Sequence, residues 1–311
     1  MNRFLKYVAA FSASLLLLAA GMEYMLRQVP NPLRFKQNLL EQHKTEMRTM
    51  IIGSSVANCG IDPACYADST YNLAISGEWM RFNQALFEKY ADSLPQLKGL
   101  IWGLCFHALW MDDAADVDKS SLINHKIYMG ICREDDYFHH LELPYLGALS
   151  MRKWSKYYIR HKSTITCDSL GLDHGYDLAL KEKSWLEEIP EMVRGQHKAM
   201  LADKDSTLYR ANVRRLHEVA RLCHERGIRL HLVMPPVHPE YVRLADRRQW
   251  EMIRTAAEGV VRQWDNVTWH DYLSDPRFTD EDFYDGNHLS SDHGAVKFTR
   301  ILRQDLQQAR P

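Results

Sequence analysis

A short apolar run, Met50-Ile51-Ile52, ends at Gly53 and two serines, and it constrains the fold of this chain more than any other stretch. Apolar runs of this length that stop at glycine and hydroxyl residues are typical of buried strands. In an α/β fold, such a strand delivers the residues that follow it to the carboxyl edge of the sheet, where ligand sites form. We therefore expect Ser54 and Ser55 to lie at a functional edge.

The remaining pattern alternates between strand-like and helix-like segments. Predicted strands cover 47–53, 71–74, 97–105, 228–234 and 267–269, and predicted helices cover 78–93, 208–226, 241–264 and 292–308. Alternation of this kind with short connections indicates a mainly parallel sheet with helices on both faces. The fold class predicted from the sequence is therefore α/β.

The N-terminus carries an apolar segment of its own. Arg3 and Lys6 precede a nearly uninterrupted apolar run over 7–22. Secretory apolar regions span about 7–15 residues and membrane-crossing helices about 17–25, so the run lies at the boundary between them. We interpret 1–28 as an uncleaved signal anchor that spans the membrane once, with a cleaved signal peptide as the alternative. Its terminal position favours export of the remainder to the periplasmic or extracellular side.

Two further regions complete the expected organisation, a helical connector over 29–46 and a catalytic domain over 47–311. Residues 112–205 break the alternating rhythm, and an insertion of this size between strands usually builds a lid or wall of a site. It begins with a cluster of four acids and also contains a basic-aromatic stretch over 152–162, which could contact anionic lipid or sugar rings or could form a solvated helix face. The acids are Asp112, Asp113, Asp116 and Asp118.

Composition excludes several classes of partner and cofactor. The formal net charge is −1 with both signs scattered, so a nucleic-acid partner is not expected. No glycine-rich phosphate loop, His-Glu-x-x-His or Cys-x-x-Cys motif occurs, so we expect neither a cofactor nor a metal. Six cysteines in an exported chain could pair in 15 ways. Cys59 and Cys65 are the first pair to test for a disulfide, whereas Cys105 is expected to be a buried free thiol.

Near the C-terminus, Asp285-Gly286-Asn287-His288 supplies a carboxylate and an imidazole three residues apart. A serine hydroxyl becomes a useful nucleophile when a neutral imidazole accepts its proton, and a carboxylate fixes the tautomer of that imidazole. Each segment alone is also common as turn or helix-cap chemistry. Together, Ser55, His288 and Asp285 form a candidate Ser/His/Asp set.

In this order the segments resemble the SGNH/GDSL hydrolase family. Gly53-Ser54-Ser55 is similar to the first block of that family, with Ser55 at the nucleophile position and Ser54 at the usual aspartate. Asn72-Leu73-Ala74-Ile75-Ser76-Gly77 resembles the second block, which implies that Gly77 lends its N–H to the oxyanion hole together with Ser55. Asp285 and His288 match the closing Asp-x-x-His. At the third block, Gly103-Leu104-Cys105-Phe106-His107 replaces the usual Gly-x-Asn-Asp and offers no side-chain amide.

Gly-Ser-Ser followed by Gly-Ile-Asp-Pro behind an N-terminal anchor is similar to a membrane-tethered branch of that superfamily, the envelope-polysaccharide-modifying and D-alanyl transfer proteins. The resemblance implies a serine esterase or O-acyltransferase that acts on a cell-envelope glycan without a cofactor, with a membrane-bound acyltransferase as a candidate partner. Candidate substrate contacts are Ser54, Asn287, His107 and His238. The missing amide leaves open a second reading, a catalytically silent, membrane-tethered scaffold protein for polysaccharide assembly.

Overall fold

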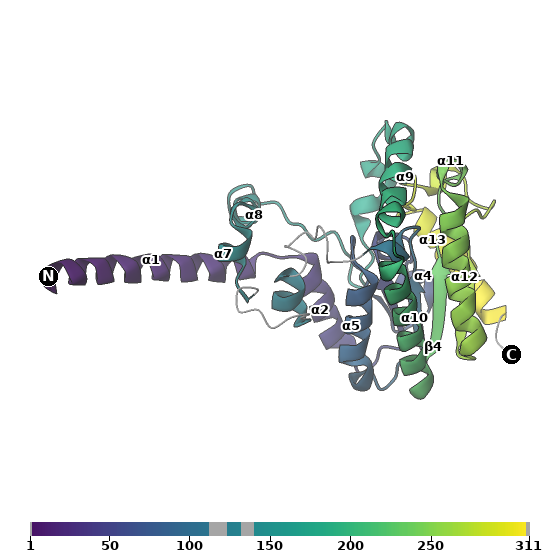
Figure 1. Ribbon diagram of the computed structural model, residues 1–311, viewed down its shortest axis with the longest axis horizontal. Helices are drawn as coiled ribbons and strands as arrows, with labels where there is room; N and C mark the ends of the chain where they lie inside the picture. Colours follow the sequence, from purple (N-terminus) through teal and green to yellow (C-terminus); the bar gives the residue numbers. More distant parts are fainter. Residues whose placement is uncertain (1, 112–122, 132–139, 309–311) are drawn as a thin grey trace. The chain divides into compact units, whose positions relative to one another are not determined.

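The computed structural model describes residues 2–111, 123–131 and 140–308 (Figure 1). Asp112, Asp113, Asp116 and Asp118 of the predicted insertion, and Cys132, lie outside the described residues. The chain divides into two compact units. An anchor unit comprises Met1–Gln37 and Asp113–Ile165, and a sheet unit comprises Asn38–Asp112 and Thr166–Pro311.

The sheet unit is built on five parallel strands in the order β2-β1-β3-β4-β5. The strands are β1 (Thr49–Gly53), β2 (Thr70–Asn72), β3 (Gly99–Gly103), β4 (Arg229–Met234) and β5 (Val267–Asp271). The order reverses between β1 and β3, and ligand sites of doubly wound sheets form outside the carboxyl ends of strands at such a switch point. The predicted α/β fold class is confirmed.

Helices cover both faces of this sheet, and α5, α10 and α12 form the front layer in Figure 1. The helices of the sheet unit that the structure describes include α3 (Ser55–Asn58), α4 (Pro63–Tyr66), α5 (Met80–Tyr90), α9 (Trp185–Ala202), α10 (Thr207–Glu225), α11 (Pro239–Leu244), α12 (Arg247–Gln263) and α13 (Gly294–Gln308). The single helix predicted over 241–264 is wrong. Ala245 is extended and Asp246 caps a new helix by accepting a hydrogen bond from the Arg248 N–H, so α11 and α12 are separate.

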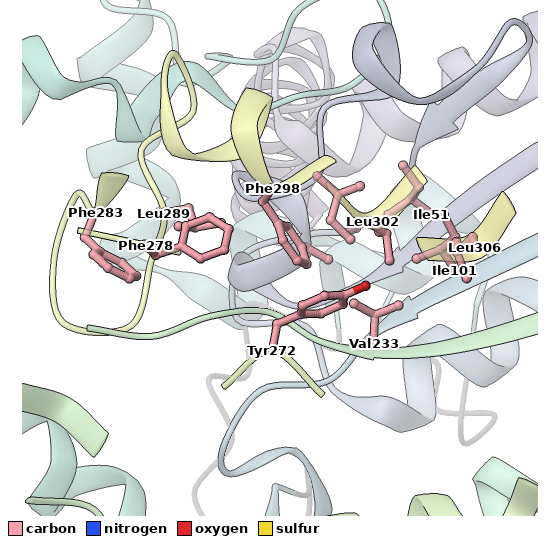
Figure 2. Packing of buried hydrophobic residues seen from close by; sticks show 13 residues of the cluster. Ile51, Ile101, Val233, Tyr272, Phe278, Phe283, Leu289, Phe298, Leu302 and Leu306 are labelled. Atoms are coloured by element: carbon pink, nitrogen blue, oxygen red, sulfur yellow. The ribbon is translucent and has the colours of Figure 1, made fainter. Parts of the chain in front are cut away.

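Alternation along the strands divides the buried side chains between the two faces. Ile51, Ile101 and Val233 project toward α13, where Phe298 and Leu302 pack against them in one apolar cluster (Figure 2). The intervening residues of β1, β3 and β4 are also buried, on the face covered by α5, α10 and α12: Met50, Ile52, Leu100, Trp102, Leu230 and Leu232. A sheet buried on both faces explains why these strands read as continuous apolar runs rather than alternating ones.

The anchor unit contains α1 (Asn2–Gln28), the start of α2 (Pro32–His43), α7 (Glu142–Leu146) and α8 (Ala148–Trp154). Helix α1 is long and apolar enough to be a membrane anchor or a signal sequence. The last turns of α1 form hydrogen bonds with other parts of the anchor unit. The Glu23 carboxylate accepts hydrogen bonds from the N–H groups of Glu142 and Leu143 at 3.1 and 2.9 Å, and the Tyr158 hydroxyl donates to the Met25 carbonyl at 3.0 Å.

The first disulfide hypothesis is wrong, because Cys59 and Cys65 are both free thiols. Cys59 is fully buried at the end of α3, whereas the Cys65 thiol on α4 interacts with Asp62 and Arg300. The two side chains therefore occupy different environments although only five residues separate them. Cys105 is a buried free thiol, as predicted.

Candidate active site

Ser55 is the first residue of α3, directly beyond the carboxyl end of β1. The turn that presents it is tight because α3 lies against two strand ends. Gly53 has a φ of +142°, and a Cβ built there would lie 2.6 Å from the Gly103 carbonyl oxygen and 2.9 Å from the Ala57 Cβ. A Cβ on Gly103 would lie 2.6 Å from the same Ala57 methyl. Glycine at both positions therefore allows α3 to begin immediately after β1.

Asp285 and His288 lie on a small hairpin that closes before α13. Phe283 and Leu289 form an isolated antiparallel bridge, and the Tyr284 N–H donates to the His288 carbonyl at 2.9 Å. Both bridge residues are buried in the core cluster, as Figure 2 shows. Lys181 fixes the preceding segment, because its ammonium donates to the carbonyl oxygens of Asp280 and Phe283.

The three predicted side chains form one hydrogen-bonded series. The Ser55 hydroxyl is 2.7 Å from His288 Nε2. His288 Nδ1 lies 3.0 and 2.9 Å from the two carboxylate oxygens of Asp285. The His288 side chain is 14% exposed, and Ser55 is half-buried. In this geometry the imidazole can accept the serine proton on one nitrogen while its other N–H donates to a carboxylate.

The environment keeps Asp285 ionised. Burial alone would raise the pKa of its carboxyl, but the nearby His288 imidazole and the N–H groups of Asn287 and His288 hold the pKa below its usual value. Those two N–H groups donate to one carboxylate oxygen at 3.0 and 2.9 Å. The short Asp-x-x-His spacing thus orients the carboxylate through the backbone as well as through the imidazole.

Gly77 lies in a turn after β2, beside the end of β1. The Ile75 N–H donates to the Gly53 carbonyl, and the Glu78 N–H donates to the Ile75 carbonyl. Gly77 has a φ of +76°, as the third residue of a type II turn requires. No atom lies within 4 Å of a Cβ built on Gly77, and the residue is exposed.

The site is supported by three residues that the sequence did not single out, Asn58, Asp173 and Tyr176, and by Asn72 and Ser76 of the second block. The Asn72 amide, fully buried, donates to the carbonyl oxygens of Ala57 and Ile61 and so ties α3 to β2. The Asn58 amide donates to Ser76 Oγ at 3.1 Å and to Asp173 Oδ2 at 2.9 Å. This second contact attaches the segment after residue 166 to the helix that begins with Ser55.

Tyr176 follows in that same segment and contacts the imidazole. Its ring centroid is 4.9 Å from that of His288, and its hydroxyl lies 3.4 Å from Ser76 Oγ. Burial raises the pKa of Tyr176, so its hydroxyl remains neutral and can act as a donor. The part of the predicted insertion that belongs to the sheet unit therefore forms a wall beside His288.

Cys105 and His107 occupy the third-block position after β3. Cys105 Sγ lies 3.9 Å from His107 Nε2. Burial alone would raise the pKa of the Cys105 thiol, but the His107 imidazole lowers it to about 7, and the thiol in turn raises the pKa of His107 against the effect of burial. Cys105 and Ser54 line one small cavity. The Ser54 hydroxyl also interacts with the Cys105 thiol and helps to lower its pKa.

The other two candidate contacts are largely buried. His238 is 6% exposed, accepts a hydrogen bond from the Glu240 N–H on Nδ1, and pairs through Nε2 with Asp280 at 3.0 Å. The backbone N–H of His238 donates to the Gly286 carbonyl, so His238 stabilises the loop that carries Asp285 and His288. Asn287 is also 6% exposed. Among residues 2–111, 123–131 and 140–308, no three His, Cys, Asp or Glu side chains gather as a metal site would require.

No protein-family model and no curated protein matches this chain. Among solved structures, the chain is similar to a protein from Streptococcus pneumonia assigned provisionally as a platelet activating factor, with 10% identity and a TM-score of 0.42 over 96% of this chain and 99% of that one. It is also similar to a mutant of an acetyl-xylooligosaccharide esterase from Geobacillus Stearmophilus, with 9% identity and a TM-score of 0.36 over 83% and 94%. Likenesses this weak do not establish an activity, which must be inferred from the side chains of this chain.

Proposed function

We propose that this chain is a serine acyl-ester hydrolase or O-acyltransferase that acts on a cell-envelope glycan through an acyl-Ser55 intermediate. The observation that carries the proposal is the 2.7 Å separation between Ser55 Oγ and His288 Nε2, with Asp285 on the other ring nitrogen. Residues separated by 233 positions in sequence rarely meet in this order of hydroxyl, imidazole and carboxylate without a chemical reason.

In the first half of the reaction, Ser55 Oγ attacks the ester carbonyl while His288 Nε2 takes the hydroxyl proton. The tetrahedral intermediate then expels the alcohol, which leaves with the proton that His288 returns. Asp285 stays ionised and stabilises the imidazolium. In the second half, water or a sugar hydroxyl attacks the acyl-Ser55 ester, and His288 again accepts and returns the proton.

The oxyanion would be held by the backbone N–H groups of Ser55 and Gly77. The first N–H groups of a helix have no partner within the helix, and Ser55 opens α3. Gly77 is a candidate second donor because it lies in an exposed turn beside the end of β1. Removing one oxyanion donor in a serine hydrolase typically costs about 10²–10³ in kcat.

A glycan substrate and an envelope location follow from the resemblance of the motifs together with helix α1. In this proposal α1 anchors the chain, the sheet unit lies on the exported side, and a membrane-bound acyltransferase supplies or receives the acyl group. Neither step requires a cofactor. Transfer instead of hydrolysis requires only that a sugar hydroxyl reaches the acyl-Ser55 carbonyl before water does.

The test is a comparison of Ser55→Ala with the parent protein, using p-nitrophenyl acetate and an acetylated glycan. Loss of the nucleophile should lower acetate release by about 10³-fold or more. Ser93→Ala, an exposed serine on the short 3-10 turn Ala91–Ser93, is the matched control and should retain full activity. Undiminished release by Ser55→Ala would remove Ser55 from the mechanism.

The silent scaffold remains the competing hypothesis, favoured by Cys105 and His107 in place of the third-block amide. The two functions differ in one respect. A scaffold needs no hydrogen bond between a serine hydroxyl and an imidazole, whereas an acyl enzyme depends on it. The Ser55 to His288 contact therefore supports the enzyme.

A further inference from the structure

A cleft of about 540 Å³ opens at the amino edge of the sheet, at the starts of β1, β3 and β4 and the end of α13. Ser55 lies beyond the other end of β1, and a strand of this length spans roughly 15 Å. This basal cleft, defined by Arg48, Lys98, Arg229 and Arg303, is therefore separate from the candidate active site.

The charge of the basal cleft is unbalanced. Its four cations face one acid, Asp68, among the lining residues. Within the described residues, the side chains of the four cations have no hydrogen bond or ion pair. Other arginines of the sheet unit do have acidic partners: Arg221 with Glu218, Arg243 with Glu240, and Arg277 with Asp275. Because the whole chain carries a formal charge of −1, this excess is local.

Ordinary folding does not explain the cluster. Arg303 lies before the last turn of α13, so the helix dipole, whose effect is confined to that turn, does not account for it. Arg48, Lys98 and Arg229 instead lie at neighbouring strand starts, where mutual repulsion opposes their proximity. Gly99 lines the cleft and would accept a Cβ in ordinary contact with Thr49, at 3.7 Å, so sterics do not require glycine there. Its missing side chain leaves the cleft open.

We propose that the basal cleft binds a small soluble anion that carries two or more phosphate groups. Guanidinium groups match phosphate oxygens bidentately, and three arginines with one lysine can engage more than one phosphate. A cavity of this volume falls within the usual range of small-molecule sites, about 300–1,000 Å³. The site does not depend on the proposed acyl chemistry.

The experiment uses the full chain in an uncharged detergent, with inorganic tripolyphosphate as the probe and calorimetry and thermal unfolding as readouts. At low salt, tripolyphosphate should bind and raise the Tm, and orthophosphate should bind at least 10-fold more weakly. High salt should weaken both, because exposed charges are screened. Equal affinity for orthophosphate would overturn the multi-phosphate assignment.

Variants separate a shaped site from diffuse charge. Arg48→Gln combined with Arg229→Gln should weaken tripolyphosphate binding at least 10-fold, while Arg214→Gln, an exposed arginine on α10, should leave it unchanged. Gly99→Leu keeps every cation but adds a side chain inside the cleft, and it should also weaken tripolyphosphate binding. Equal binding by all variants, or no binding by the parent chain, would refute the proposal. If phosphatidic acid vesicles displaced tripolyphosphate but soluble pyrophosphate did not, the ligand would be a lipid headgroup. That result would refute the proposal of a soluble ligand.

Discussion

Gly53 and Gly103 show at the scale of single residues how the turn that presents Ser55, the candidate nucleophile, is built. Ala57 of α3 occupies the space that a side chain on either glycine would need. Gly53→Ala should cost about 1–3 kcal/mol from overpacking, with a similar further cost from its positive φ, and Gly103→Ala should show the overpacking cost alone. Chemical denaturation measures both.

The matched control is Gly195→Ala in α9, where a built Cβ meets no atom within 4 Å. Alanine there should be neutral or stabilising by up to about 1 kcal/mol, because glycine is a poor helix former. If Gly53→Ala were as stable as this control, α3 could not be packed as tightly as described.

The pKa of the Cys105 thiol should depend on the neighbouring His107 imidazole. With His107 present the thiol has a pKa of about 7, so much of it is thiolate at pH 8. In His107→Gln the lowering effect of the imidazole is lost, burial is opposed only by the Ser54 hydroxyl and the backbone N–H of residue 107, and the pKa of the thiol should rise. The ultraviolet absorbance of the thiolate, taken as a difference from Cys105→Ser, follows the titration. An unchanged midpoint in His107→Gln would show that the imidazole does not control the thiol.

The residues of the site were predictable from sequence to different degrees. Ser55, Asp285 and His288 were singled out because each lies in a short motif whose chemistry is local. Asn58, Asp173 and Tyr176 were not, because their contacts join positions 100 or more residues apart and follow no period. Only the fold brings them together.

At the scale of elements, the Asn58 amide is the tie between α3 and the segment after residue 166. Asn58→Asp removes a donor and places a carboxylate beside Asp173, with which the native amide makes a 2.9 Å bond. We expect a loss of about 1–3 kcal/mol in unfolding free energy at pH 7. The loss should shrink near pH 4, where the new carboxyl protonates and can donate again. Equal stability at pH 7 would show that this tie does not matter.

Element prediction succeeded where the apolar pattern is continuous and failed where caps or breakers intervene. All five strands of the described sheet were expected. The apolar pattern is most continuous in β1, β3 and β4, because the sheet is covered on both faces there. The Asp246 cap splits the helix predicted over 241–264. Helix α9 was missed because it contains Pro190 and Gly195, residues that usually interrupt helices.

At the scale of the whole molecule, α1 continues without a break from the apolar run into turns that contact α7. We therefore predict that the mature protein keeps its first residues and resists extraction from membranes by alkaline carbonate. Intact mass spectrometry of the membrane-derived protein checks this directly. A mass that lacks about 20 N-terminal residues would instead indicate a cleaved signal peptide.

The central claim is that Ser55 is an activated nucleophile, and covalent labelling by a fluorophosphonate tests it most directly. Peptide mass spectrometry of the labelled native chain should place one adduct on Ser55. The adduct should disappear in Ser55→Ala and form much more slowly in His288→Ala, because the imidazole accepts the serine proton. A native chain that takes no label, or takes it only on another residue, would contradict the claim.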